Sequence, residues 1–138
     1  MGAVQKSLRI PQGTFEEIER IARETGRDFS SIAKDLLAEA IKMRRCPNIV
    51  FADGVSGRRA RIAGTGLEVW EVISTYRSVN QDSSRLQKAY HWLTEQQLRA
   101  AIGYYTAYRQ EIDELIKLNE SWSTETVTER FPFLNRDK

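Results

Sequence analysis

The chain has 138 residues, of which 41% are hydrophobic and 29% charged, a composition that indicates a folded, soluble protein rather than a disordered one. The single cysteine, Cys46, excludes a disulfide framework and a thiolate metal cluster. Neither a signal peptide nor a bilayer-spanning apolar run is recognisable, so we expect a cytoplasmic protein. The net charge is only +2, but basic residues outnumber acidic ones up to Gly66 and acidic residues predominate beyond it, which is compatible with DNA contact at the N-terminal end.

Residues 4–10 alternate between apolar and polar side chains, the pattern of a strand with one buried face. Leu8 and Ile10 lie on the apolar face, and Gln5, Ser7 and Arg9 lie on the polar one. Pro11 ends this predicted strand.

Two amphipathic helices are predicted next. Thr14 and Glu17 have the spacing of a capping box at the start of the first helix, and Gly26 is placed to end it. Asp28 is a suitable N-cap for the second helix. The apolar faces consist of Phe15, Ile18, Ile21 and Ala22 in the first helix, and Phe29, Ile32, Leu36, Leu37, Ala40 and Ile41 in the second. The second helix ends in a basic cluster, and the Cys46-Pro47-Asn48 break that follows predicts a domain boundary, with a first domain of residues 1–45.

A strand this short cannot bury its edges or its apolar face alone, so we expect it to pair, antiparallel, with the same strand of a second chain. The stretches KSLRIP, FEEIERIARETG and GRDFSSIAKDLLAEAI resemble the ribbon-helix-helix superfamily of DNA-binding proteins, which includes the Arc and MetJ repressors and ParD-type antitoxins. The resemblance implies a homodimer whose two-stranded ribbon enters the major groove of operator DNA.

Carried onto this chain, the resemblance makes Gln5, Ser7 and Arg9 the base-reading residues. Arginine can donate two parallel hydrogen bonds to guanine, and glutamine can pair bidentately with adenine. The implied phosphate contacts are the backbone amides at the start of the second helix and two auxiliary cations: Phe29, Ser30, Ser31, Lys6 and Arg27.

A second small domain is predicted over residues 46–118. Residues 49–52 and 58–62 read as a hairpin, and three helices follow, the last running without interruption from the Thr94 and Gln97 capping box through Ile116. The stretches ARIAGTGLEVWEVISTYR, AYHWLT and EQQLRAAIGYYTAYRQEI resemble domain-of-unknown-function family 433, whose usual residues are arginine at the place of Gly66 and histidine at the place of Trp92. This resemblance implies a hairpin-and-helices fold like a helix-turn-helix or winged helix, and a kinship with antitoxins of the VapB type.

Several features of this second domain have two interpretations. Arg58, Arg59 and Arg61 suit either a basic hairpin that binds DNA or an acidic partner, or an exposed strand face kept soluble by charge. Gly64 and Gly66 indicate a turn rather than a nucleotide site. His91 is the only histidine, and no residue spacing suggests catalysis or metal binding, so we expect a protein that is not an enzyme and holds no cofactor.

Residues 119–138 lack periodicity and are expected to form an extended tail with spaced apolar anchors. In ribbon-helix-helix antitoxins such a segment wraps a toxin, so the resemblance makes the following residues candidate contacts to a PIN-like ribonuclease toxin: Trp122, Arg130, Phe131, Phe133, Leu134 and Arg136. The alternative for this tail is that it packs on its own dimer or stays loose.

The fold expected is therefore mostly α: a ribbon-helix-helix homodimer with a swapped two-stranded antiparallel ribbon, a small winged-helix-like domain and an extended tail. The leading function is an antitoxin that also represses its own promoter. The alternatives are a stand-alone transcriptional regulator without a toxin and a structural DNA-organising protein, for which steep salt dependence without operator preference is expected.

Overall fold

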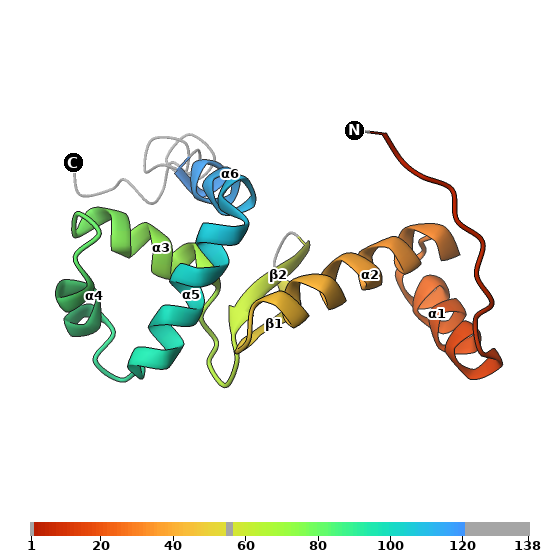
Figure 1. The fold of residues 1–138 in the computed structure, drawn as a ribbon, viewed down its shortest axis with the longest axis horizontal. Helices are drawn as coiled ribbons and strands as arrows, with labels where there is room; N and C mark the ends of the chain where they lie inside the picture. Colours follow the sequence, from red (N-terminus) through yellow and green to blue (C-terminus); the bar gives the residue numbers. More distant parts are fainter. Residues whose placement is uncertain (1, 55–56, 121–138) are drawn as a thin grey trace, which may run out of the picture. The chain divides into compact units, whose positions relative to one another are not determined.

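The computed structural model describes residues 2–54 and 57–120, and the chain divides into two compact units. We call residues 1–42 the N-terminal unit and residues 43–138 the C-terminal unit. The boundary falls inside the second helix rather than at the predicted Cys46-Pro47-Asn48 break. The described residues are mostly helical, as predicted, with one two-stranded antiparallel hairpin (Figure 1). No helix among them has the length and apolar character needed to cross a membrane.

The first helix, α1 (Gln12–Thr25), begins earlier than predicted. Thr14 lies inside α1, so the predicted capping box with Glu17 is wrong. The Pro11 carbonyl instead accepts the hydrogen bond from the Phe15 N–H at 3.0 Å, and the φ of −55° at proline already suits a helix start. The predicted end is correct: Gly26 has φ of 67°, and its N–H and that of the next residue close the last turn.

The second helix, α2 (Phe29–Arg45), packs on α1 through a very small core. Ile18, Ala22 and Ile32 are the buried members, with Ile21 and Phe29 partly buried around them. The Phe15 and Phe29 rings also meet, with centroids 5.2 Å apart. Residues 2–11 form neither helix nor strand within the single chain, so pairing of residues 4–10 with a second chain stays a prediction.

The described residues of the C-terminal unit that follow α2 form a hairpin and four helices. β1 (Ile49–Gly54) pairs antiparallel with β2 (Gly57–Ile62), with Ile49 opposite Ile62. The helices are α3 (Val69–Ser78), α4 (Ser83–Ala89), α5 (Glu95–Ala107) and α6 (Arg109–Glu120). Figure 1 places α4 on the side of this unit away from the hairpin.

Local signals explain where these helices start. The Asp82 carboxylate accepts hydrogen bonds from the Ser84 and Arg85 amides, and Thr94 and Gln97 form the predicted capping box of α5. A second capping box, Glu68 with Glu71, begins α3 and was not predicted.

The predicted long helix from Thr94 through Ile116 is wrong, because it is two helices that meet at Tyr108. Neither proline nor glycine marks the break, and Tyr108 leaves the helical region with φ of −129° and ψ of 50°. The bend lets α6 bury Ile112 and Ile116 in the same core as α3 and α5. Tertiary packing therefore outweighs a helical periodicity that continues across the break.

A continuous apolar core holds the C-terminal unit together, in contrast to the N-terminal unit. Its fully buried large side chains are Tyr104, Ile62, Ile73, Leu86, Ile112, Val69 and Val72. They come from the hairpin and all four helices, which is why this unit buries its apolar face without a partner.

Candidate dimer and nucleic-acid interface

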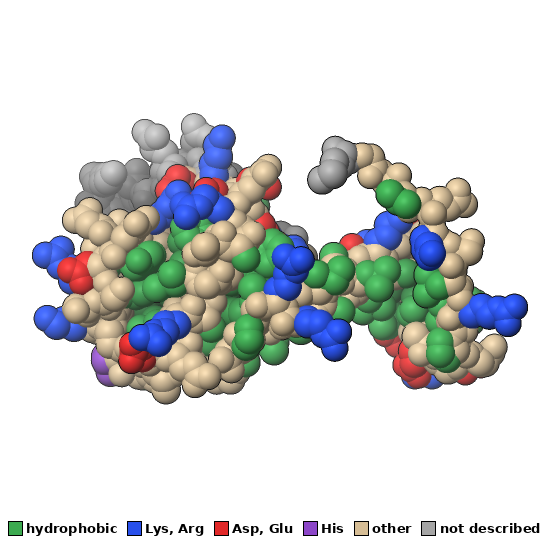
Figure 2. All heavy atoms as spheres, viewed as in Figure 1, with side chains coloured by type: hydrophobic (Ala, Val, Ile, Leu, Met, Phe, Trp, Pro, Cys, Tyr) green, Lys and Arg blue, Asp and Glu red, His purple; other side chains and the backbone are tan. Residues whose placement is uncertain are grey.

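An open apolar groove of about 660 Å³ runs along the N-terminal unit. Its walls are residues 8–11 of the N-terminal segment, one face of α1 and one face of α2. Leu36, Leu37 and Ala40 continue this face along α2, and Leu37 exposes 63% of its surface. Figure 2 shows hydrophobic side chains gathered over the middle of α2. This unit therefore exposes more large apolar side chains than it buries.

The predicted inner face of the N-terminal strand lies at this groove. Leu8 and Ile10 both line it, although Leu8 is 70% exposed in the single chain. Gln5, Ser7 and Arg9, the predicted base-reading residues, are all exposed, and Arg9 also reaches the groove wall. Val4 lies further out and is almost fully exposed.

The predicted phosphate anchor at the start of α2 is partly occupied by the chain itself. The Asp28 carboxylate accepts a hydrogen bond from the Ser31 N–H at 2.8 Å, as the predicted N-cap should. This hydrogen bond is the main reason why the pKa of Asp28 lies below its usual range. The amides of Phe29 and Ser30 have no acceptor among the described residues, so they remain the open donors of this helix end.

Arg27, predicted as an auxiliary phosphate contact, lies against a carboxylate. Its Nη1 is 2.6 Å from Oδ2 of Asp35 on α2, and both side chains are about half exposed. The pair spans the turn between the helices, because Arg27 precedes α2 and Asp35 lies two turns into it. Lys6, the other predicted auxiliary cation, is exposed on the N-terminal segment.

Sequence reasoning missed Lys34. This exposed residue lies one turn after Ser30 on α2, and both residues line the apolar groove together with Arg9. Lys34 makes no ion pair within the described part of the chain, although its charge lowers the pKa of Asp28. No sequence pattern marked Lys34, because the groove that it lines is formed by several elements.

The hairpin arginines are engaged with acceptors of their own chain. Arg59 is largely buried and lies 3.9 Å from Glu68, whereas Arg58 lies 3.4 Å from the exposed Asp53. Nη2 of Arg61 donates to the Asp53 carbonyl at 3.2 Å. These contacts favour a structural role for the three arginines over an open basic surface.

Two buried tyrosines bind carboxylates of α6. Tyr104 is fully buried and donates its hydroxyl to Glu111 at 2.7 Å; burial, more than this bond, raises its pKa well above the usual range. Tyr105 donates to Asp113 at 2.7 Å, and Arg77 of α3 also binds Asp113. Burial likewise raises the pKa of the Cys46 thiol.

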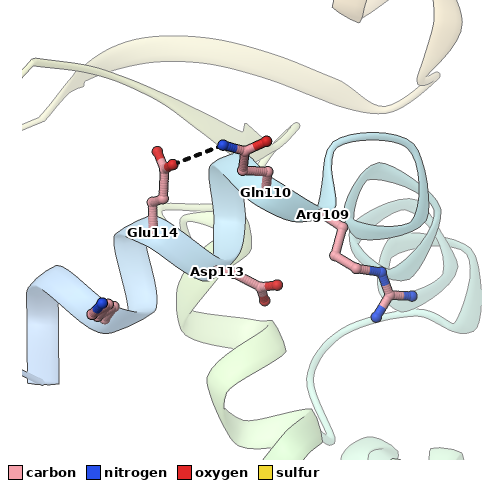
Figure 3. Close-up of a pocket in the computed structure, with 5 residues that line it drawn as sticks. Arg109, Gln110, Asp113 and Glu114 are labelled. Carbon is pink, nitrogen blue, oxygen red and sulfur yellow. Dashed lines mark hydrogen bonds between the residues drawn. The ribbon is translucent and has the colours of Figure 1, made fainter.

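A shallow hollow of about 390 Å³ follows the exposed side of α6 (Figure 3). Arg109 stacks over the Tyr105 ring at 4.7 Å, Gln110 donates to Glu114, and Asp113 is engaged as described. Arg109, Gln110, Asp113 and Glu114 thus each have a partner within the described residues, and nothing in the hollow points to a ligand.

The remaining predictions for the C-terminal unit concern a turn, the single histidine and the tail. Gly64 has φ of 78° in the turn before α3, which agrees with the turn interpretation. His91 is exposed beside Trp92, and no group of three metal-ligating side chains occurs in residues 2–54 and 57–120. The proposed toxin contacts, Trp122, Arg130, Phe131, Phe133, Leu134 and Arg136, lie outside the described residues.

Residues 49–105 match the family model described as protein of unknown function (DUF433). This match covers the hairpin, α3, α4 and most of α5. It agrees with the resemblance inferred from the sequence. No curated protein and no solved structure matches the chain.

Proposed function

We propose that the N-terminal unit forms a homodimer through its apolar groove and binds operator DNA through residues 4–10. The observation that supports this proposal most is the contrast between three buried core residues and an apolar groove of about 660 Å³ in the same unit. A second copy is the natural occupant, because the N-terminal segment that lines the groove carries unpaired backbone donors and acceptors as well as apolar side chains.

The energetic argument follows from the exposed side chains. Complete burial of a leucine or isoleucine stabilises by about 1.5–3 kcal/mol, and Leu8, Leu37 and Ile41 are each more than half exposed. A symmetric interface counts each of these side chains twice. The total is comparable with the association cost of about 4–15 kcal/mol, so a stable dimer needs most of the groove to be covered.

The DNA part of the proposal rests on the opposite face of the same segment. If residues 4–10 pair as a strand with Leu8 and Ile10 over the groove, strand alternation turns Gln5, Ser7 and Arg9 outward, and Arg9 then leaves the groove wall that it lines in the single chain. Their donors and acceptors suit base edges in the major groove. The dimer would place two such sets beside one another, which suits a palindromic operator.

We propose further that the C-terminal part neutralises a PIN-like ribonuclease toxin, which makes the protein an antitoxin and autorepressor. This part is supported by the resemblance of the sequence to antitoxins; the family that matches residues 49–105 has no assigned function. A stand-alone regulator without a toxin is the alternative, and it is favoured by the continuous core that the described residues of the C-terminal unit form within one chain.

The dimer is tested by light scattering on the full chain. Leu37→Glu should convert a dimer into a monomer, whereas Leu118→Glu, at a similarly exposed leucine of α6, should leave the dimer intact. A monomeric wild-type protein at tens of micromolar, or an unaffected Leu37→Glu variant, contradicts the proposal. DNA binding is then measured by gel shift with the DNA upstream of its own gene.

The toxin proposal needs a separate experiment. The neighbouring reading frame is co-expressed with the full chain and with a variant truncated after Asn119. If the full chain relieves growth arrest and the truncated chain does not, residues 120–138 are needed to neutralise the toxin, as proposed. Equal relief by both, or a neighbouring product without nuclease activity, favours the alternative.

A further inference from the structure

The two basic side chains next to the start of α2 have different surroundings. Arg27 is paired with Asp35 at 2.6 Å across the turn between α1 and α2. Lys34 is exposed and has no ion pair among residues 2–54 and 57–120. These surroundings decide which of the two can bind an external anion.

We propose that Lys34 supplies a DNA phosphate contact of the N-terminal unit and that Arg27 is a positioning residue rather than a contact. The proposal rests on the proposed DNA-binding function. It replaces Arg27, one of the two cations predicted from the sequence to contact phosphate, by Lys34. The group that would bind the phosphate is the ammonium of Lys34, which lines the groove together with Ser30, one turn earlier on the same helix.

The position of Lys34 suits this role. Ser30 and Lys34 line the groove from α2, and Arg9 lines it from the N-terminal segment, so the exposed Lys34 belongs to the same groove as the segment that would read bases. A lysine can lay its apolar stem along the wall of such a groove while its ammonium remains in water. A second copy that covers the groove therefore leaves the charge available to a phosphate.

Arg27 is poorly placed for the same task. The Arg27 guanidinium is partly neutralised by Asp35, and a phosphate bound to its remaining N–H groups would lie close to the Asp35 carboxylate, which repels it. As a pair, Arg27 and Asp35 tie the turn to the second turn of α2 and hold the orientation of this helix end.

The number of phosphate contacts can be measured from the salt dependence of binding. Each contact contributes about 0.9 to the slope of log K against log salt concentration. Because a dimer carries two copies of Lys34, Lys34→Ala should lower this slope by about 1.8, and Lys34→Arg should restore it. Arg27→Ala should weaken binding without changing the slope.

The probe is a fluorescent mixed-sequence duplex of about 30 base pairs, followed by anisotropy with the full chain at several salt concentrations. Arg23→Ala is the matched control, since Arg23 lies in the last turn of α1 and does not line the groove. Asp28→Asn should tighten binding several-fold, because asparagine caps the helix equally well and lacks the negative charge.

The positioning role has its own readout. Asp35→Asn should weaken DNA binding as much as Arg27→Ala, again at constant slope, and the double variant should be no weaker than either single one. Additive losses contradict the positioning role.

Three outcomes separate the possible failures. A Lys34→Ala slope equal to that of the wild type overturns the Lys34 assignment. A slope that falls for Arg27→Ala as much as for Lys34→Ala overturns the division between the two residues. A wild-type protein that binds no duplex at low salt contradicts the proposed DNA-binding function itself.

Discussion

Tyr104 offers the sharpest test of the packing in the C-terminal unit. Its side chain is fully buried, its hydroxyl donates to Glu111 at 2.7 Å, and its pKa is raised above the usual value near 10 by burial first and by Glu111 second. Tyr104→Phe removes the hydroxyl and keeps the ring. At neutral pH the lost charge-assisted hydrogen bond should cost about 1.5–3 kcal/mol in the free energy of unfolding.

The pH dependence gives an independent magnitude. In the unfolded chain Tyr104 ionises near pH 10, whereas the folded chain keeps it protonated well beyond that pH. Its contribution to stability is therefore complete below about pH 10 and declines as the pH rises, by about 1.4 kcal/mol per pH unit. Wild type and Tyr104→Phe should thus converge in stability by about 1.4 kcal/mol between pH 9 and pH 11.

Urea unfolding followed by tryptophan fluorescence is a suitable assay, because all three tryptophans lie in the C-terminal unit. Tyr76→Phe is the control at neutral pH, since this partly exposed tyrosine makes no hydroxyl hydrogen bond among the described residues. A stability difference between wild type and Tyr104→Phe that stays constant from pH 9 to pH 11 would refute the reasoning.

Three further predictions concern the N-terminal unit and the helix caps. Gly26→Ala should destabilise the N-terminal unit by about 1 kcal/mol, because Gly26 has φ of 67°, which strains a residue with a Cβ even where space is open. Gly13→Ala inside α1 should instead stabilise the unit by about 0.5–1 kcal/mol. Thermal unfolding followed by circular dichroism measures both changes. Asp82→Ala should cost about 1 kcal/mol through the lost N-cap of α4, measured by the same fluorescence assay, and an unchanged midpoint would contradict the capping role. Arg9→Ala should abolish operator preference in a gel shift while light scattering still finds the wild-type mass, and undiminished operator affinity would remove Arg9 from the base-reading set.

Local chemistry made much of the helical pattern predictable. The left-handed position of Gly26, the Asp28 cap on Ser31 and the Thr94–Gln97 capping box all lie where sequence reasoning placed them. Each depends on residues within a few positions of one another, so nothing distant can alter it. The predicted capping box at Thr14 is wrong for a reason that is also local: the helix already begins after Pro11.

Side-chain partners in the candidate interface were predictable only in part. Gln5, Ser7 and Arg9 are exposed, but so are Leu8 and every other described residue up to Arg9, so this exposure does not test the predicted strand alternation. The pairing of Arg27 with Asp35 was not predicted. That pair joins residues eight positions apart across a turn, and its geometry depends on how α2 leaves α1. Lys34 became a candidate cation only when its neighbours in the groove were known.

The sequence alone determined the mostly helical character, the caps at Gly26, Asp28 and Thr94, and the apolar faces of the helices, because these follow from short-range periodicity and backbone chemistry. Tertiary structure alone decided where the helix after Thr94 breaks, since burial of Ile112 and Ile116 outweighs a periodicity that runs unbroken through Tyr108. Tertiary structure also decided which apolar faces are buried within the single chain. The C-terminal unit closes its core within one chain, whereas the strand-like alternation of residues 4–10 and the face of α2 remain uncovered. Burial is a property of the packed surfaces that surround a side chain, and no local pattern specifies whether they come from one chain or two.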